Sequence, residues 1–151
     1  MTVLLDTNVL LRLAQMTHPA HATSRAAVSA LQRAGNTLHL VPQNLYEFWV
    51  VATRPVAQNG LGLSAVEAAA EIGRLRTLFP LLLDTPAILA GWEKLVITHA
   101  VLGKNAHDAR LVATMFVHGL TQLLTFNTVH FARFPGITVL DPSSVAAPPT
   151  P

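Results

Sequence analysis

The change from an apolar run into a helix at the start of the chain is the feature that most limits its possible folds. Residues 3–5 are all apolar and are followed directly by Asp6. Val9, Leu10 and Leu13 then recur at the spacing of one helix face. A strand that is apolar at every position is typical of a parallel sheet covered on both faces. We therefore expect a buried strand that ends at an acidic side chain, where the next helix begins.

The same alternation of strand and helix patterns continues along the chain. It predicts helices near residues 20–34, 44–54, 64–78, 86–102 and 106–118, and strands near residues 38–41, 80–83, 121–125 and 137–140. The fold class is thus α/β, a three-layer sandwich with a mostly parallel, five-stranded central sheet. Such sheets bind ligands at the carboxyl ends of their strands, near a topological switch point, and Asp6 lies at such an end.

The length of 151 residues suits a single domain, which we expect to span residues 1–142. Residues 143–151 are rich in proline and lack hydrophobic periodicity, so we expect them to form a disordered tail. No run approaches the roughly 20 apolar residues that a membrane span needs. We therefore expect no membrane association.

The composition limits the chemistry and indicates an interface. The chain has no cysteine, which excludes disulfides and thiolate zinc sites and favours the cytoplasm. No basic segment precedes a long apolar stretch at the N-terminus, so we expect no signal peptide. Apolar residues make up 51% of the chain, more than a small domain readily hides. A homodimer or a bound partner would cover the excess; the alternative is a core unusually rich in Ala and Leu.

The formal charge of +2 permits nucleic acid as a partner without requiring it, but the acids are few enough to weigh singly. Asp6 is a candidate ligand or a helix cap. Glu47 lies in an apolar helix with no Lys or Arg before Arg54, which favours function over an ion pair with a distant residue. Asp108 lies in the first turn of a helix, where the helix dipole favours an anion, but it borders the core-facing stripe.

The other five acids are interpreted as structural or solvated. Glu67, Glu71 and Glu93 have polar or Ala neighbours. Asp84 lies at a strand end before a capped helix with Pro86 near its first position, and Asp141 lies in a terminal turn before Pro142. The three remaining acids lie on separate elements. Carboxylates arranged in this way suit Mg²⁺ or Mn²⁺, which can activate a water and neutralise the charge of a phosphodiester.

These motifs resemble those of a known family. Residues 4–10 (LLDTNVL), Glu47, residues 107–109 (HDA) and residues 124–131 (LTFNTVHF) follow in the order of the PIN-domain ribonucleases, particularly the VapC-type toxins of toxin-antitoxin modules. The resemblance runs from residue 2 to about residue 142. It implies that the chain is a metal-dependent endoribonuclease and that Asp6, Glu47 and Asp108 hold the metal. It also implies an RNA substrate, an antitoxin peptide in a hydrophobic groove, and a homodimer.

The chain departs from the family pattern after its fourth expected strand, where the family commonly adds a fourth acid. Asn127 and His130 stand where acids could be. Asn127 could ligate through its carbonyl or hold a metal-bound water, so we include it among the catalytic candidates, while His130 could contact phosphate or a softer metal. The pattern thus supports one metal site and leaves a second open.

Neighbouring polar and basic residues complete the candidate site. Thr7, Asn8 and Thr125 match positions that hydrogen-bond near the acids, or else serve ordinary turn chemistry. Four basic residues lie near the acidic motifs and could hold RNA phosphates or form surface ion pairs: Arg12, Lys104, Arg110 and Arg133. Phe48 and Trp49 could stack a base, but their apolar helix favours core packing or an interface.

Two other functional classes, a phosphatase and a signalling domain, fit the sequence less well. A haloacid-dehalogenase-like phosphatase needs a second acid two residues after the first, where this chain has Asn8. A receiver-like signalling domain would use paired Asp residues and a late lysine, but Lys94 and Lys104 both precede the fourth strand. The alternative that the missing fourth acid keeps open is a catalytically weakened PIN domain that binds RNA or protein.

Overall fold

The apolar N-terminal run forms the central strand of the fold. The computed structural model describes residues 1–147, and in it β1 (Thr2–Leu5) runs directly into α1 (Thr7–Ala14). Asp6 is the N-cap of α1, and the backbone N–H of Thr7 donates to its carboxylate. The predicted strand, the acid at its end and the helix after it are therefore all confirmed.

The sheet is parallel throughout its four strands, which lie in the order β2-β1-β3-β4. The other strands are β2 (Thr37–His39), β3 (Gln122–Leu124) and β4 (Thr138–Leu140). Strands β1 and β3 form the centre of the sheet; the chain goes outwards from β1 to β2 at one edge and from β3 to β4 at the other edge. The switch point thus lies at the carboxyl ends of β1 and β3, the position at which open α/β sheets bind ligands.

The prediction of a fifth strand at residues 80–83 was wrong. This segment makes only an isolated parallel bridge, between Leu81 and Leu40 at the free edge of β2. Leu40 donates to the carbonyl of Pro80 and accepts from the N–H of Leu82, at 2.9 and 2.8 Å. Pro80 has no N–H with which to extend the pairing, so the segment crosses the sheet edge at one point and continues towards the next helix.

The predicted helices are present, and three short ones were missed. The helices are α2 (His21–Arg33), α3 (Pro42–Thr53), α4 (Ala65–Leu78), α5 (Ala87–Thr98), α6 (Asn105–Val117), α7 (Thr128–Phe131) and α8 (Pro142–Ala146), with a 3-10 turn at Val56–Gln58. The 3-10 turn, α7 and α8 are too short to show helical periodicity in the sequence. The helix predicted to reach residue 102 ends at Thr98, because the chain turns through a positive φ at Ala100.

The expectation of a disordered tail from residue 143 is wrong for residues 143–146. These residues belong to α8, whose first turn is capped by Asp141 through the N–H of Ser143. Val145 and Ala146 pack against the core under α2, which supplies the burial that the sequence pattern did not reveal. The remainder of the predicted tail, residues 148–151, lies outside the described residues.

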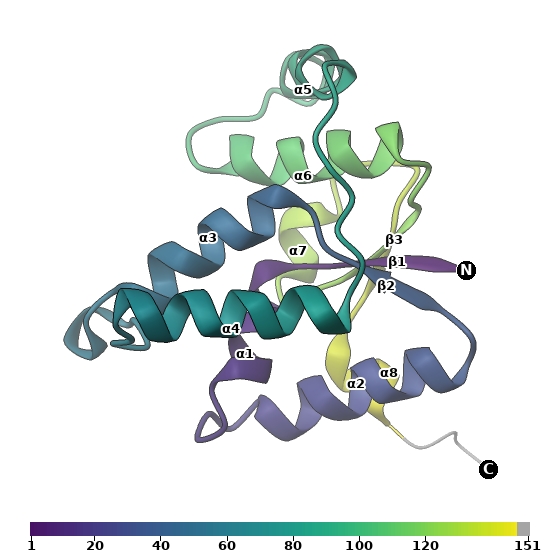
Figure 1. The fold of residues 1–151 in the computed structure, drawn as a ribbon. Coiled ribbons are helices and arrows are strands. Elements are labelled where there is room, and N and C mark those ends of the chain that lie inside the picture. Colours follow the sequence, from purple (N-terminus) through teal and green to yellow (C-terminus); the bar gives the residue numbers. More distant parts are fainter. Residues whose placement is uncertain (148–151) are drawn as a thin grey trace.

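Helices cover both faces of the sheet and form two separate cores (Figure 1). Val3 and Leu5 face one core with α1, α2, α3 and α4, whereas Leu4 faces the other with α5, α6 and α7. Alternate side chains of a strand point to opposite faces, which explains why every position of β1 is apolar. The three-layer arrangement is confirmed.

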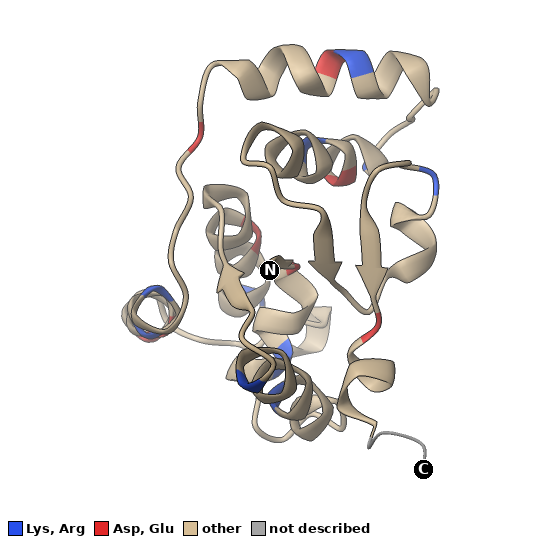
Figure 2. Cartoon of the chain, turned by 90° about the vertical axis from the view of Figure 1, so that its right-hand side faces the viewer, with Lys and Arg blue, Asp and Glu red and all other residues tan. Residues whose placement is uncertain are grey.

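The extended segment between α4 and α5 runs along one side of the sheet (Figure 2). It carries Asp84, which the sequence assigned to a helix cap. Asp84 does not cap α5, whose N-cap is Pro86, but accepts a hydrogen bond from Arg110 of α6 at 2.9 Å. Among residues 1–147, no helix has both the length and the apolar character required to traverse a bilayer.

Candidate functional site

Asp6 lies at the switch point with a buried carboxylate that is 7% exposed. One oxygen accepts from the backbone N–H of Thr7 at 2.7 Å. The other accepts from the Thr125 hydroxyl at 2.6 Å and from the side-chain amide of Asn8 at 3.0 Å. Asp6 is therefore a helix cap, but its second oxygen is held by a separate set of polar side chains, which a cap does not require.

The charge of Asp6 is opposed by its surroundings. Burial is the main reason that its pKa rises from 3.8 to about 6. Hydrogen bonds from Thr125 and Thr7 act in the opposite direction, while the carboxylates of Glu47 and Asp108 raise the pKa further. The three acids selected from the sequence are thus close enough to repel one another.

Glu47 extends from α3 towards the same point. One carboxylate oxygen accepts from the Thr7 hydroxyl at 2.9 Å, and the other accepts from the side-chain amide of Gln43 at 2.8 Å. None of the ion pairs formed within residues 1–147 includes Glu47. The alternative of an ion pair with a distant residue is therefore not realised in the described part of the chain.

The helix of Glu47 is less buried than the sequence indicated. Phe48 is completely buried in the core, as its apolar surroundings predicted. Tyr46, Trp49 and Val50 are 67%, 37% and 57% exposed. Helix α3 packs on the core along one side only, so its apolar sequence serves both a core face and an exposed face.

Asp108 lies in the first turn of α6 and is half-buried. Burial raises its pKa, the neighbouring His130 lowers it, and Glu47 raises it. His130 Nδ1 lies 3.5 Å from a carboxylate oxygen of Asp108. Helix α7 therefore places His130 beside Asp108. His130 is one of the two residues that the sequence analysis found in place of a fourth acid.

Thr125 and Asn8 connect the ends of β1 and β3. The buried Thr125 hydroxyl donates to Asp6 and accepts from the Asn8 side chain at 3.1 Å and from the Asn127 N–H at 2.9 Å. The Asn8 carbonyl oxygen accepts from the N–H of Phe126 at 3.3 Å. These contacts fix the orientation of Asp6 and leave the Asn127 side chain at the rim.

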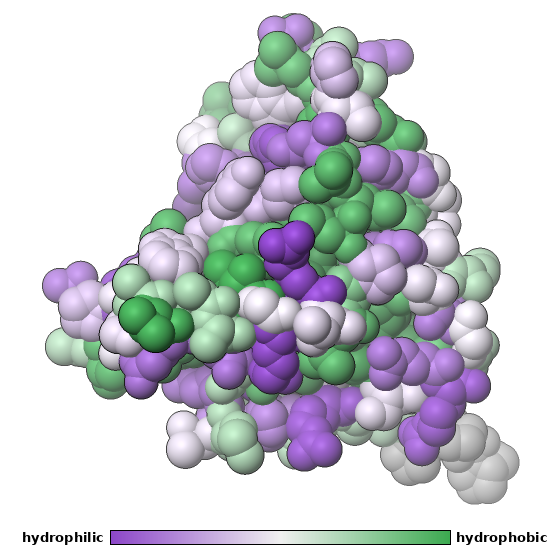
Figure 3. Space-filling view, in the orientation of Figure 1, coloured by the Kyte–Doolittle hydropathy of each residue, from purple (hydrophilic) through white to green (hydrophobic). Residues whose placement is uncertain are grey.

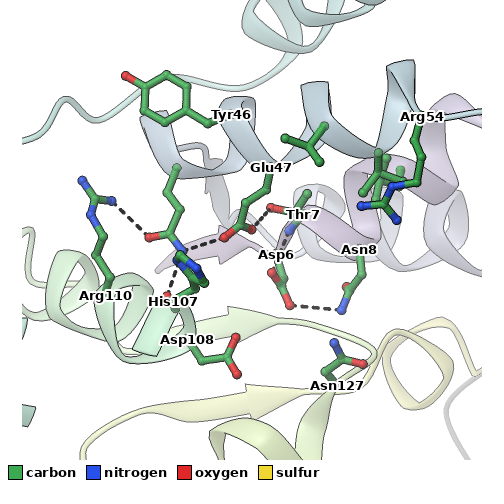
Figure 4. Close-up of a pocket in the computed structure, with 14 residues that line it drawn as sticks. Asp6, Thr7, Asn8, Tyr46, Glu47, Arg54, His107, Asp108, Arg110 and Asn127 are labelled. Carbon is green, nitrogen blue, oxygen red and sulfur yellow. Dashed lines mark hydrogen bonds between the residues drawn. The ribbon is translucent and has the colours of Figure 1, made fainter. Parts of the chain in front are cut away.

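The three acids and several of the other candidate residues line a single cavity of about 740 Å³ (Figure 4). Asp6 and Glu47 lie close together beside Thr7, Asp108 extends from α6 towards them, and Asn127 lies opposite Asn8. The complete lining is Asp6, Thr7, Asn8, Leu11, Gln43, Tyr46, Glu47, Val50, Val51, Arg54, His107, Asp108, Arg110 and Asn127. Thr125 and His130 do not line the cavity but contact residues that do.

Gln43, which the sequence analysis missed, connects two of the elements that carry acids. Its side-chain N–H groups donate to Glu47 and to the backbone carbonyl of His107, both at 2.8 Å. Its carbonyl oxygen accepts from Arg110 at 3.0 Å. Gln43 is buried and one helical turn before Glu47, a spacing that could have indicated the contact. It sets the position of α3 relative to the start of α6.

The predicted basic residues are only partly gathered at the site. Arg110 lines the cavity, whereas Arg12 does not and donates to Gln15 at 2.8 Å. Lys104 and Arg133 are exposed and lie outside the lining. Arg54, absent from the predicted set, lines the cavity because the end of α3 lies beside α1.

The donor set fits a hard divalent cation. Three carboxylates and the Asn127 amide surround one cavity, and none of the three acids is paired with Lys or Arg within residues 1–147. No group of three or more His, Asp or Glu in those residues is already arranged to hold a metal ion. The carboxylates are partly dehydrated and their negative charges are not neutralised by Lys or Arg. Mg²⁺ or Mn²⁺ would stabilise these charges once the side chains move to coordinate it.

Comparisons with known proteins identify the family and the fold of the chain. A family model described as the PIN domain matches residues 3–137. A search of curated protein sequences found no match.

Among solved structures, the fold is similar to VapBC2 from Rickettsia felis bound to a promoter DNA fragment, with a TM-score of 0.70, 13% identity, and 93% of this chain and 98% of that chain covered. It is also similar to VapBC-1 from nontypeable Haemophilus influenzae, with a TM-score of 0.68, 17% identity, and 95% and 99% covered. The Mycobacterium tuberculosis toxin VapC20, which cleaves the sarcin-ricin loop, matches with a TM-score of 0.60, 18% identity, and 80% and 86% covered. At these identities the likeness establishes a shared fold.

Proposed function

Because the chain belongs to the PIN-domain family, we propose that it is an endoribonuclease that depends on Mg²⁺ or Mn²⁺. The observation that carries this proposal is the convergence of Asp6, Glu47 and Asp108 from separate elements on one cavity, where none of them pairs with a Lys or Arg of residues 1–147. Buried like charges destabilise a fold unless they serve a ligand.

Each candidate has a definable part in this proposal. Asp6, Glu47 and Asp108 would hold the metal, and the Asn127 amide lies where it could add an oxygen ligand. The bound metal would activate a water and neutralise charge on the scissile phosphate. No Lys or Arg of the described residues pairs with these carboxylates, which keeps them available for that cation.

The surrounding residues orient the acids and bind substrate. Thr125 holds Asp6, and Thr7 and Gln43 hold the two oxygens of Glu47. Arg110 and Arg54 line the cavity and would contact the phosphates of a single-stranded RNA. The formal net charge of the chain is only +2, so we expect moderate affinity with a strong dependence on salt.

The same proposal includes an antitoxin partner and a homodimer. A groove of about 430 Å³ between α1, α2 and α4 has an apolar part, lined by Leu13, Met16, Val28, Leu78 and Phe79, and a polar part, lined by His21, Arg25, Ser29, Gln32 and Arg74. This lining suits an amphipathic peptide. Exposed apolar residues lie on several helices, and Figure 3 shows hydrophobic side chains gathered near the centre of one face. The fold is also similar to a toxin-antitoxin complex from Klebsiella pneumoniae, which supports the assignment of this chain as the toxin of such a pair.

Cleavage of a single-stranded RNA by the purified chain tests the proposal. We expect cleavage with Mg²⁺ or Mn²⁺, none with EDTA, and loss of cleavage in Asp6→Asn and Asp108→Asn. The matched control is Glu71→Gln, an acid on α4 that pairs with Arg74 away from the cavity. Cleavage that persists in EDTA, or in both cavity variants, would contradict the assignment.

A binding module without catalysis is the second candidate. Both oxygens of Glu47 already accept hydrogen bonds, and Asn127 and His130 replace acids at the rim. This arrangement is also what a site with weakened metal affinity would show. Metal-independent binding of the RNA without cleavage at any tested metal concentration would favour it.

A further inference from the structure

A second cavity adjoins the carboxylate cavity and has a different chemical character. Its volume is about 580 Å³, within the range of small-molecule sites. It lies between the segment that follows residue 83, helix α5 and the start of α6, and its walls include Ile88, Leu89, Trp92 and Ala106. It shares two lining residues, His107 and Arg110, with the carboxylate cavity, so the two cavities lie side by side.

From this arrangement we propose that the second cavity binds one nucleobase of the RNA, next to the phosphodiester that lies in the carboxylate cavity. The proposal rests on the nuclease function proposed above, because a bound phosphodiester is what brings a base to this position. Proteins that bind single-stranded RNA splay bases out of the strand and place them against aromatic side chains.

Trp92 is the aromatic residue at this wall. Its indole N–H donates to the carbonyl of Ala106 at 2.9 Å, which fixes the ring between α5 and α6. The ring is only partly buried and lines the cavity. A ring held in place in this way loses little freedom when a base packs against it, so it is suited to contact a flat ligand.

The boundary between the cavities carries the positive charge that a phosphate requires. Arg110 donates to Gln43 on one side and to Asp84 on the other, at 3.0 and 2.9 Å. Its guanidinium therefore lies between the acids and the apolar cavity. A nucleotide that crosses this boundary would place its phosphate beside Arg110 and its base beyond it, which satisfies both the charge and the apolar walls.

Two polar groups of the second cavity have hydrogen-bonding capacity to spare. The buried hydroxyl of Thr85 has no hydrogen-bond partner, and a buried polar atom without one calls for an explanation. Asp84 uses one carboxylate oxygen for Arg110, and the other accepts no hydrogen bond within residues 1–147. A free carboxylate oxygen favours bases that present an amino group, namely adenine, cytosine and guanine, over uracil.

Nucleotide binding can be measured without cleavage. The chain has two tryptophans, so Trp49→Phe leaves Trp92 as the only one. The Trp92 fluorescence of this variant is titrated in EDTA with AMP, GMP, CMP and UMP, and with ribose 5-phosphate to measure the contribution of phosphate alone. We expect saturable quenching by the nucleotides that is weakest for UMP, and little response to ribose 5-phosphate.

A pair of variants on α5 locates the binding site. Leu89 lines the cavity and is exposed enough to be replaced without disturbing the core, whereas Ile97 is exposed on the same helix outside the cavity. In the Trp49→Phe background, Leu89→Glu should weaken nucleotide binding about tenfold or more, the scale of one lost base contact. Ile97→Glu adds the same charge and should leave binding within about twofold.

The outcomes separate this proposal from the nuclease function. Quenching with the expected variant pattern supports the base site even if the chain cleaves no RNA. Absence of saturable quenching by every nucleotide in an actively cleaving chain overturns the base site alone, as does equal weakening by both α5 variants. If Leu89→Glu leaves nucleotide binding unchanged but dissociates a dimer in light scattering, the cavity belongs to an interface between copies of the chain and the proposal is wrong.

Discussion

Replacement of Asp6 by Asn should stabilise the metal-free protein while it removes activity. Burial raises the pKa of Asp6 from 3.8 to about 6, so the folded chain holds this carboxyl in its charged form at neutral pH at a cost in free energy. The difference between the two pKa values corresponds to ~3 kcal/mol at pH 7.5. Asn keeps the size of Asp and carries no charge.

The expected gain is smaller than this because Asn alters two hydrogen bonds. Its carbonyl can still accept from the Thr7 N–H, so the cap of α1 is kept. Its amide would replace the oxygen that accepts from Thr125 and Asn8, and both contacts would have to rearrange. We therefore expect a net gain of about 1–2 kcal/mol, or roughly 2–8 °C in melting temperature.

The pH dependence identifies the cause of this gain. Because the folded pKa lies above the unfolded value, the folded chain binds more protons between pH 3.8 and about 6, and its stability falls as the pH rises through that range. The penalty is absent below about pH 4. The gain of Asp6→Asn should therefore be present at pH 7.5 and much smaller at pH 4.

Urea unfolding at the two pH values, in EDTA and at one protein concentration, measures the effect. The control Glu71→Gln, at a half-buried acid that pairs with Arg74 on the same helix, should change the stability by less than about 0.5 kcal/mol at either pH. Mg²⁺ should stabilise the original chain and not Asp6→Asn, since only the former keeps the full set of acids. A gain of the same size at both pH values, or no gain at pH 7.5, would refute the assignment of Asp6 as a destabilised buried charge.

Three further substitutions test the surroundings of the site. Gln43→Met keeps the side-chain volume but removes the hydrogen bond from Gln43 to Glu47. We expect the affinity for Mn²⁺, measured by calorimetry, to fall about tenfold. An unchanged affinity would exclude a positioning role for Gln43. Thr125→Val removes a hydrogen bond that lowers the pKa of Asp6, so that pKa should rise above about 6 in a carboxyl NMR titration of the metal-free protein; a fall would be inconsistent with the geometry. Phe48→Ala should cost about 3–5 kcal/mol in urea unfolding, and a cost below about 1 kcal/mol would show that this side of α3 is not part of the core.

Helix α3 shows both the reach and the limit of sequence reasoning. Its apolar composition predicted a helix and identified Glu47 as an unusual acid, because a carboxylate among apolar residues is costly. The same composition suggested a largely buried helix, but Tyr46, Trp49 and Val50 are exposed. Periodicity states which residues share a face and not what covers that face.

The edge of the sheet shows another limit. The run around residues 80–83 has strand composition, but whether a strand forms depends on the partner available for its backbone groups. Only Leu40 offers pairing there, and Pro80 limits it to one bridge. The short helix α8 illustrates the reverse case, in which packing under α2 stabilises a segment without periodicity of its own.

The sequence by itself determined the α/β class, the strand that leads to Asp6 and the identity of the three acids, because these follow from local periodicity and from the cost of isolated carboxylates. Only the tertiary structure decided how the acids are held. The contacts of Gln43 with His107, of Thr7 with Glu47 and of Thr125 with Asp6 join residues that are far apart in sequence and lie on different elements. Hydrogen-bond partners and desolvation arise when the elements pack together, so no local pattern encodes them.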